Sequence, residues 1–174
     1  RPANRPHGRQ FGMEPSPPTL QLRGARSADA PRVTKCYLAS YKAMLQSMAP
    51  LARSDEEVEA WVRDTLIPAG GVSVAVESGM VVGFIAVAQR AEGAWIEHLY
   101  VHPHHIRRDV GSTLLYLALA RLKGTVHLYT FEANKGARKF FERYGFQAIA
   151  FGDGSSNDAG RPDVLYQRES NGRG

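Results

Sequence analysis

The sequence predicts an α/β domain built around one mixed β-sheet. One strand and two helical segments come first, three strands then follow in quick succession, and strands alternate with helices to the end of the chain. With 174 residues, of which 43% are hydrophobic, the chain can bury one core but is too short for two ordinary domains. We therefore expect one folded domain at 19–170, between a disordered N-terminal tail at 1–18 and a flexible C-terminus at 171–174.

The first half of the domain shows three local patterns. Thr19–Arg23 alternates leucine with polar residues, which predicts a half-buried strand. Apolar residues recur three and four positions apart over Ala30–Met48, which predicts a helix. Ser54 and the acidic residues after it are typical of a helix start, and this second helix should end before Pro68.

The later elements are separated by clear turn signals. Strands are predicted at Val72–Glu77, Val81–Ala88, Trp95–Val101, Val126–Phe131, Phe146–Phe151 and Asp163–Arg168. The first three of these strands should form an antiparallel meander, because short turns that contain glycine join them. A third helix is closed by Gly124, and a fourth covers Lys135–Tyr144.

Composition argues against several classes of function. No apolar run approaches the roughly 20 residues that a membrane helix requires, and the N-terminus lacks the apolar segment of a secretory signal. The single cysteine, Cys36, cannot form an internal disulfide, so we expect a cytoplasmic protein with a packed thiol. Part of the net charge of +5 lies in the N-terminal tail, and a polyanionic small ligand explains the rest as well as a nucleic acid does. We expect neither a nucleic acid nor a membrane as partner.

The most informative stretch joins the strand at Trp95–Val101 to the third helix. A basic turn with Arg107 and Arg108 leads to Gly111 at the helix start. Unpaired backbone amides and the helix dipole attract anions at such a position, and arginine side chains suit phosphate oxygens. The stretch therefore predicts a pyrophosphate site. The alternative is a solvated turn in which Gly111 merely starts a helix.

Two motifs in this region resemble those of the GNAT superfamily of N-acetyltransferases. The stretch from Trp95 to Leu115 is similar to motif A, in which a strand that ends in Val-x-Pro leads to a glycine-containing loop. Asn134–Phe146 is similar to motif B, usually Asn-x-x-Ala-x-x-Phe-Tyr-x-x-x-Gly-Phe. The motifs occur in the family's order with a predicted strand between them. The resemblance covers the predicted domain and implies a mixed, mostly antiparallel sheet flanked by helices on both faces.

The resemblance also implies acetyl-CoA as cosubstrate and no metal ion. The backbone of Leu99, Tyr100 and Val101 would pair with the pantetheine arm as an added strand does. The other implied cofactor-binding residues are Arg107, Arg108, Asp109, Val110, Gly111 and Ser112 around the pyrophosphate, and Asn134. Two positions depart from motif A: Ile106 replaces a glutamine or arginine, and Asp109 replaces a glycine. The Asp109 carboxylate would repel a diphosphate unless it points away or pairs with an arginine.

Acetyl transfer to an amine requires a base that removes the ammonium proton. Glu97 is the candidate catalytic base, because it lies on the strand two residues before the segment implied to pair with pantetheine. Simple alternation puts Glu97 and Leu99 on one apolar face and His98 on the other. The alternative is a structural glutamate in a salt bridge, with His98 or solvent accepting the proton.

In the family motif the general acid is a tyrosine, but Phe141 occupies that position and has no proton to donate. Tyr144, near the same helical face, is the candidate catalytic acid, and simple packing is the alternative. The histidines from His98 to His105 lack the spacing and partners of a metal site, so we expect none there.

These observations predict an enzyme that transfers an acetyl group directly from acetyl-CoA to a primary amine of a small molecule or peptide. Asp153, Asp158 and Asp163, in and after the polar loop that follows Phe151, suggest a cationic acceptor. The alternative is a catalytically silent module of the same fold that binds an acyl-CoA as a sensor or interaction protein. A homodimer is compatible with both.

Overall fold

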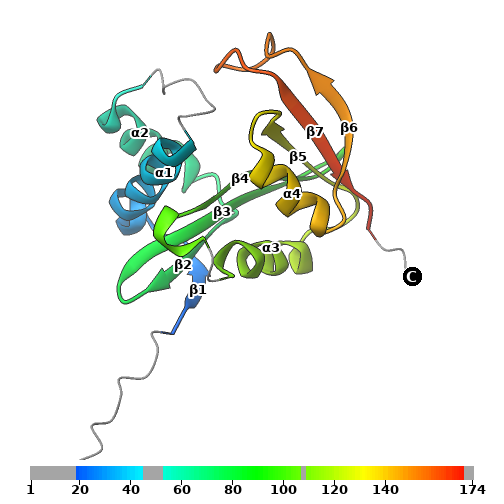
Figure 1. Cartoon of the computed structure of the whole chain (residues 1–174). Coiled ribbons are helices and arrows are strands. Elements are labelled where there is room, and N and C mark those ends of the chain that lie inside the picture. Colours follow the sequence, from blue (N-terminus) through cyan, green and yellow to red (C-terminus); the bar gives the residue numbers. More distant parts are fainter. Residues whose placement is uncertain (1–18, 45–52, 107–108, 171–174) are drawn as a thin grey trace, which may run out of the picture.

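A seven-stranded mixed sheet forms the centre of the protein, whose computed structural model describes residues 19–44, 53–106 and 109–170 (Figure 1). The strands are β1 (Gln21–Gly24), β2 (Val72–Glu77), β3 (Met80–Arg90), β4 (Gly93–Val101), β5 (Val126–Phe131), β6 (Gln147–Gly152) and β7 (Asp163–Arg168). Their order across the sheet is β1-β2-β3-β4-β5-β7-β6. Only the β4–β5 pair among these neighbours is parallel, so the predicted antiparallel meander of β2, β3 and β4 is confirmed.

Helices cover both faces of the sheet (Figure 1). They are α1 (Ala30–Met44), α2 (Asp55–Trp61), α3 (Val110–Arg121) and α4 (Lys135–Arg143), with short helical turns η1 (Ser27–Asp29), η2 (Val62–Leu66) and η3 (Pro103–His105). Residues of α1, α2 and η2 form one core cluster with β2 and β3, and residues of α3 and α4 form another with the opposite face. The predicted fold class, a mostly antiparallel mixed sheet between two helical layers, is confirmed.

Most predicted element boundaries agree with the structure to within two residues. The helix start at Ser54 is confirmed, because the side-chain oxygen of Ser54 accepts a hydrogen bond from the backbone N–H of Glu57 at 3.2 Å. The α1 helix begins at Ala30 as predicted. Its predicted end at Met48 and both predicted tails lie outside the described residues.

Gly83 of β3 lets α3 pack closely on the sheet. A Cβ atom at this position would lie 2.8 Å from Val110 Cγ1, 3.1 Å from Leu114 Cδ1 and 3.2 Å from the backbone oxygen of Tyr100. Val110 and Leu114 belong to the first turns of α3. Because Gly83 has no side chain, the start of α3 can pack closely against β3 and the end of β4.

We expect Gly83→Ala to lower the free energy of unfolding by about 1–3 kcal/mol, the usual cost of overpacking a core. Gly24→Ala is the matched control, because a Cβ at Gly24 has no atom within 4 Å. Urea denaturation of both variants measures the difference. Equal midpoints for Gly83→Ala and the control would show that the contact between α3 and the sheet is loose.

Candidate active site

Strand β4 separates from β5 after its first residues. Within the described residues, the two strands pair only at Ala94 with Val126 and at Trp95 with His127. The rest of β4 is paired with β3 and has an open edge on the β5 side. An open strand edge can pair with an extended chain of amides.

The direction of the backbone groups at the end of β4 follows from one hydrogen bond. The N–H of His102 donates to the carbonyl of Val82 at 2.8 Å, so this residue faces β3. Because backbone groups alternate along a strand, the N–H groups of Leu99 and Val101 face the open edge. The carbonyl of Val101 accepts a hydrogen bond from the Ser40 hydroxyl of α1 at 2.9 Å. The strand segment that the motif resemblance assigns to pantetheine thus has backbone donors directed at the open edge.

A β-bulge interrupts β4 at Glu97. Ala86 pairs with His98 and Val87 pairs with Ile96, so Glu97 is an extra residue without a partner on β3. The predicted alternation is therefore wrong across Glu97, although Leu99 and Val101 lie on the opposite face from Tyr100, as predicted. Ile96 packs in the same core cluster as Leu99, instead of lying on the face of His98.

The predicted apolar surroundings of Glu97 are also wrong. Its side chain is 36% exposed, and its carboxylate forms a salt bridge with Arg90 of β3, with Nη2 to Oε1 at 2.5 Å. The guanidinium of Arg90 also lies over the Trp95 ring, 5.5 Å from its centroid. Glu97 has to leave this salt bridge, or reach the amine through water, to act as a base. Its catalytic role stays a prediction.

His98 lies in an aromatic cluster that the sequence analysis did not identify. The cluster consists of Tyr37 and Tyr41 from α1, Trp61 from α2, and His98 and Tyr100 from β4. Burial lowers the pKa of His98 below its usual value, so its imidazole is neutral near pH 7. In the sequence, the tyrosines and the tryptophan fit the apolar stripes of their own helices. Only the folded chain brings these stripes to His98.

The start of α3 explains why motif A has a glycine at the position of Asp109. Asp109 is the residue before α3 and has φ of +57°, in the left-handed region. Aspartate adopts this conformation more readily than most residues, although glycine does so at lower cost. The Asp109 carbonyl accepts hydrogen bonds from the hydroxyls of Ser112 and Thr113 at 3.1 and 2.7 Å. The predicted cofactor residues 107–108 lie outside the described residues.

The charge of Asp109 gives a testable expectation. We expect Asp109→Asn to tighten acetyl-CoA binding about three- to tenfold at low ionic strength, because it removes a like charge near a diphosphate. Asparagine also tolerates the left-handed conformation, so the backbone should keep its shape. Calorimetric titrations at low and high salt measure the effect, which should fade as salt screens it. A gain with Asp109→Gly but none with Asp109→Asn would show that the conformation, and not the charge, limits affinity.

Gly111, in the first turn of α3, faces Val101 of β4 and Phe140 of α4. A Cβ at Gly111 would lie 3.4 Å from Val101 Cγ2 and 3.6 Å from Phe140 Cζ. These are ordinary contact distances, so alanine fits, but a longer side chain would meet Val101 and Phe140. Val110 at the preceding position is buried in the core.

Asn134 begins α4 and reaches toward α1. Its side-chain oxygen accepts a hydrogen bond from the backbone N–H of Ala137 at 3.1 Å, which caps the helix. Its amide nitrogen donates to the sulfur of Met44 at 3.2 Å. Asn134 thus connects the helices of the two faces of the sheet, and its predicted contact with the cofactor stays a prediction.

The aromatic residues at the end of α4 lie in or against the core. Phe141 is buried, and its ring centroid lies 5.5 Å from that of Phe146. Tyr144 is half-buried at the C-terminal cap, and its ring packs 5.1 Å from that of Phe140. This contact favours a packing role for Tyr144. The role of Tyr144 as the catalytic acid stays a prediction.

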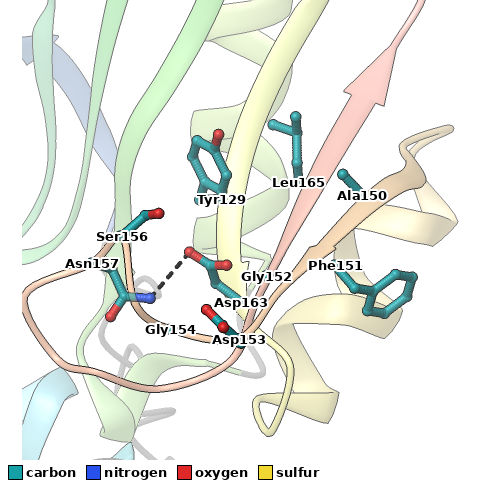
Figure 2. A pocket seen from close by; sticks show the side chains of 10 residues that line it. All are labelled: Tyr129, Ala150, Phe151, Gly152, Asp153, Gly154, Ser156, Asn157, Asp163 and Leu165. Carbon is teal, nitrogen blue, oxygen red and sulfur yellow. Dashed lines mark hydrogen bonds between the residues drawn. The ribbon is translucent and has the colours of Figure 1, made fainter.

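The loop between β6 and β7 lines an open pocket of about 410 Å³ (Figure 2). Tyr129 of β5 and Leu165 of β7 supply its apolar wall, and Asp153 and Asp163 supply carboxylates. Asn157 Nδ2 donates to Asp163 Oδ2 at 3.2 Å, as Figure 2 shows. The pocket therefore combines two aromatic residues, Tyr129 and Phe151, with two acidic groups.

Three further observations concern the rest of the described chain. Cys36 is buried, and burial raises the pKa of its thiol to about 12, so the predicted packed thiol is confirmed. Residues 19–44, 53–106 and 109–170 contain no group of three or more histidine, cysteine, aspartate or glutamate side chains placed to hold a metal ion. In the same residues, every helix is too short or too polar to cross a membrane.

Known proteins with similar sequences and folds agree on one family. The acetyltransferase (GNAT) family model matches residues 38–146. An uncharacterized N-acetyltransferase of Escherichia coli, YafP, is 32% identical over 102 residues, which are 55% of this chain and 63% of that protein. The match thus spans less than two thirds of the relative's length.

Two solved structures share the fold at low sequence identity. A GNAT-family acetyltransferase from Bacillus cereus superposes with a TM-score of 0.68 at 17% identity, covering 87% of this chain and 98% of that one. The PaiA N-acetyltransferase from Thermoplasma acidophilum, solved in complex with coenzyme A, gives a TM-score of 0.68 at 18% identity, covering 87% and 99%. Because the family model covers more than half of the sequence and the fold agrees, the chain belongs to the GNAT family of acetyltransferases.

Proposed function

We propose that the protein is an N-acetyltransferase that transfers an acetyl group from acetyl-CoA directly to a primary amine. The open edge of β4 carries this proposal. Its backbone donors at Leu99 and Val101 lie beside the start of α3, where the first turn of the helix offers unpaired amides. This arrangement accommodates an extended amide-containing arm that ends in a pyrophosphate, which is the shape of coenzyme A. The PaiA enzyme, which shares the fold, was solved in complex with coenzyme A, and this supports coenzyme A as the ligand.

The chain's own residues would supply each step of the transfer. Glu97 takes the proton of the acceptor ammonium, directly or through a water molecule, and the amine nitrogen then attacks the thioester carbonyl carbon. The N–H of Leu99 faces the same edge and donates to the oxyanion that forms on that carbonyl. The attacking nitrogen then loses its second proton to solvent, and when the intermediate collapses the C–S bond breaks and coenzyme A leaves as a thiolate. Tyr144 or solvent returns a proton to the thiolate, which is a good leaving group because a thiol pKa is near 8.5.

The acceptor would approach from the side of the β6–β7 loop. The carboxylates of Asp153 and Asp163 in the pocket of this loop favour a cationic acceptor over an anionic one. Small-molecule amines and the amines of peptides both meet this requirement. We keep both as substrate classes.

A catalytically silent acyl-CoA-binding module is the second candidate function. Two observations favour it: Phe141 replaces the usual acid, and Glu97 is held in a salt bridge with Arg90. Both candidates bind the cofactor, so binding alone does not separate them.

Release of free coenzyme A separates the two functions. The assay measures thiol production from acetyl-CoA over a panel of primary amines, alongside calorimetric binding of acetyl-CoA. We expect binding and amine-dependent thiol release with at least one cationic amine. Binding without release over the whole panel would identify the silent module, and absence of binding would remove both functions.

A further inference from the structure

We propose that the outer side of α3 is the contact surface of a homodimer, in which two copies of the chain pack their α3 helices antiparallel. This surface consists of Thr113, Tyr116, Leu117 and Ala120, and we call it the α3 face. The proposal goes beyond the proposed function and does not depend on it, because neither the cofactor nor the acceptor is placed on the α3 face.

The α3 helix is apolar on all sides. From Val110 to Ala120 it contains no charged residue. The buried residues of its inner side are Val110, Leu114, Leu115 and Ala118. A surface helix normally carries charged side chains on the side that faces water, and a helix that is hydrophobic all round is normally buried. The outer side of α3 therefore has the composition of a covered surface.

The α3 face is nevertheless open to water in the single chain, where α3 lies on the outside of the sheet (Figure 1). Tyr116 is 79% exposed, the largest fraction among the exposed large hydrophobic residues of the described chain. Ala120 is also exposed, and Thr113 and Leu117 are partly exposed. Residues at this spacing of three and four lie on one side of a helix. Burial of this stripe against an apolar partner would remove it from water.

The two ends of the α3 face carry opposite charges. Asp109 directly precedes the helix and is exposed. Lys123 follows its C-terminal end and is also exposed. The backbone of Lys123 is held in place by hydrogen bonds with the side chain of Gln89, at 3.1 and 3.2 Å. Asp109 and Lys123 are about 20 Å apart along the helix axis, so they do not pair with each other within one chain.

A twofold axis at Tyr116 matches these features to one another. Asp109 and Lys123 are equally far from Tyr116 in the sequence, so antiparallel pairing places Asp109 of each copy opposite Lys123 of the other. The Tyr116 rings meet at the centre, and the small side chains of Thr113 and Ala120 let the helices approach closely. Each helix N-terminus then lies beside a C-terminus, which suits the helix dipoles.

The α3 face is therefore complementary to itself, as a twofold interface requires. An unrelated apolar partner would use the central residues but would not need opposite charges at matched distances from Tyr116. The charges at Asp109 and Lys123 thus favour a second copy of this chain as the occupant.

Sedimentation of the full chain over a wide range of protein concentration tests the proposal. One helix face buries a small area, so we expect a dimer with a dissociation constant in the micromolar range. Tyr116→Asp should weaken the dimer at least about thirtyfold, because it replaces a central aromatic contact with two facing carboxylates. Tyr129→Asp is the matched control, since Tyr129 is 60% exposed but lies on β5. Circular dichroism melts show whether each variant is folded.

A charge exchange tests the antiparallel arrangement. Lys123→Asp alone places carboxylates opposite each other and should weaken the dimer about tenfold at low ionic strength. Addition of Asp109→Lys restores opposite charges across the axis and should recover most of this loss. A monomer at every concentration would overturn the proposal and leave a different partner as the occupant. Equal effects of Tyr116→Asp and Tyr129→Asp, or no recovery in a folded double variant, would also overturn it.

Discussion

Glu97→Gln is expected to lower turnover by roughly 10²–10⁴-fold while the affinity for acetyl-CoA stays unchanged. Glutamine cannot accept the ammonium proton, and general-base catalysis typically contributes a factor of this size. A lysine-like amine with a pKa near 10.4 is almost fully protonated at pH 7, so the reaction depends on a base. Steady-state kinetics and calorimetry on the same variant measure the two quantities. The acidic limb of the pH–rate profile, which reports the base, should also disappear.

The salt bridge with Arg90 provides the control for this prediction. Arg90→Met removes the partner of Glu97 but leaves its carboxylate in place. An exposed salt bridge contributes at most about 1 kcal/mol, so this variant should fold normally. If Glu97 is the base, Arg90→Met keeps most of the turnover. If both variants lose turnover and stability to the same extent, Glu97 is a structural partner, and neutral His98 becomes the candidate base.

Gly111→Trp is expected to weaken acetyl-CoA binding roughly a hundredfold or more, a loss of about 2.7 kcal/mol, because the indole would keep the pyrophosphate from the backbone at the start of α3. The indole would extend from the first turn of α3 toward Val101 of β4 and Phe140 of α4. Gly111→Ala, whose methyl group makes ordinary contacts there, should bind with a much smaller loss.

Ala120→Trp on the same helix is the control for bulk, because Ala120 is exposed. Circular dichroism melts show whether each variant is folded. Undiminished affinity in a folded Gly111→Trp variant would place the cofactor elsewhere on the protein.

The fold could be predicted from the sequence because its elements carry local signals. The strands β5 and β7 have the predicted limits, and the cap at Ser54 and the glycine after α4 mark helix ends that need no tertiary information. The order of the two GNAT-like motifs along the chain then predicted how the sheet and the helices are arranged. These features depend on neighbours in sequence.

The chemistry around Glu97 could not be predicted, because it depends on one inserted residue. A β-bulge leaves no mark in an alternating pattern, yet it changes the face of every residue after it. It therefore puts Ile96 on the same face of β4 as Leu99 and leaves Glu97 without a partner on β3, where Arg90 reaches it. The partner lies on the preceding strand, so residue spacing on β4 alone gave no sign of it.

The aromatic cluster around His98 and the contact between Asn134 and Met44 were missed for a related reason. Each joins segments far apart in the chain, and every residue in them also fits a local structural role such as packing or capping. Local patterns predict the elements on which such residues lie. Only the packing of α1 and α2 on β4 brings the side chains together.

Hydrogen–deuterium exchange with and without acetyl-CoA tests the central claim most directly. The account predicts slower exchange in peptides that cover 96–101 and 109–113, because the N–H groups of Leu99 and Val101 and the first turn of α3 gain acceptors from the cofactor. Peptides from β1, at the far edge of the sheet, should not change. Binding of acetyl-CoA with unchanged exchange at 96–101 would contradict the placement of the cofactor on the open edge of β4.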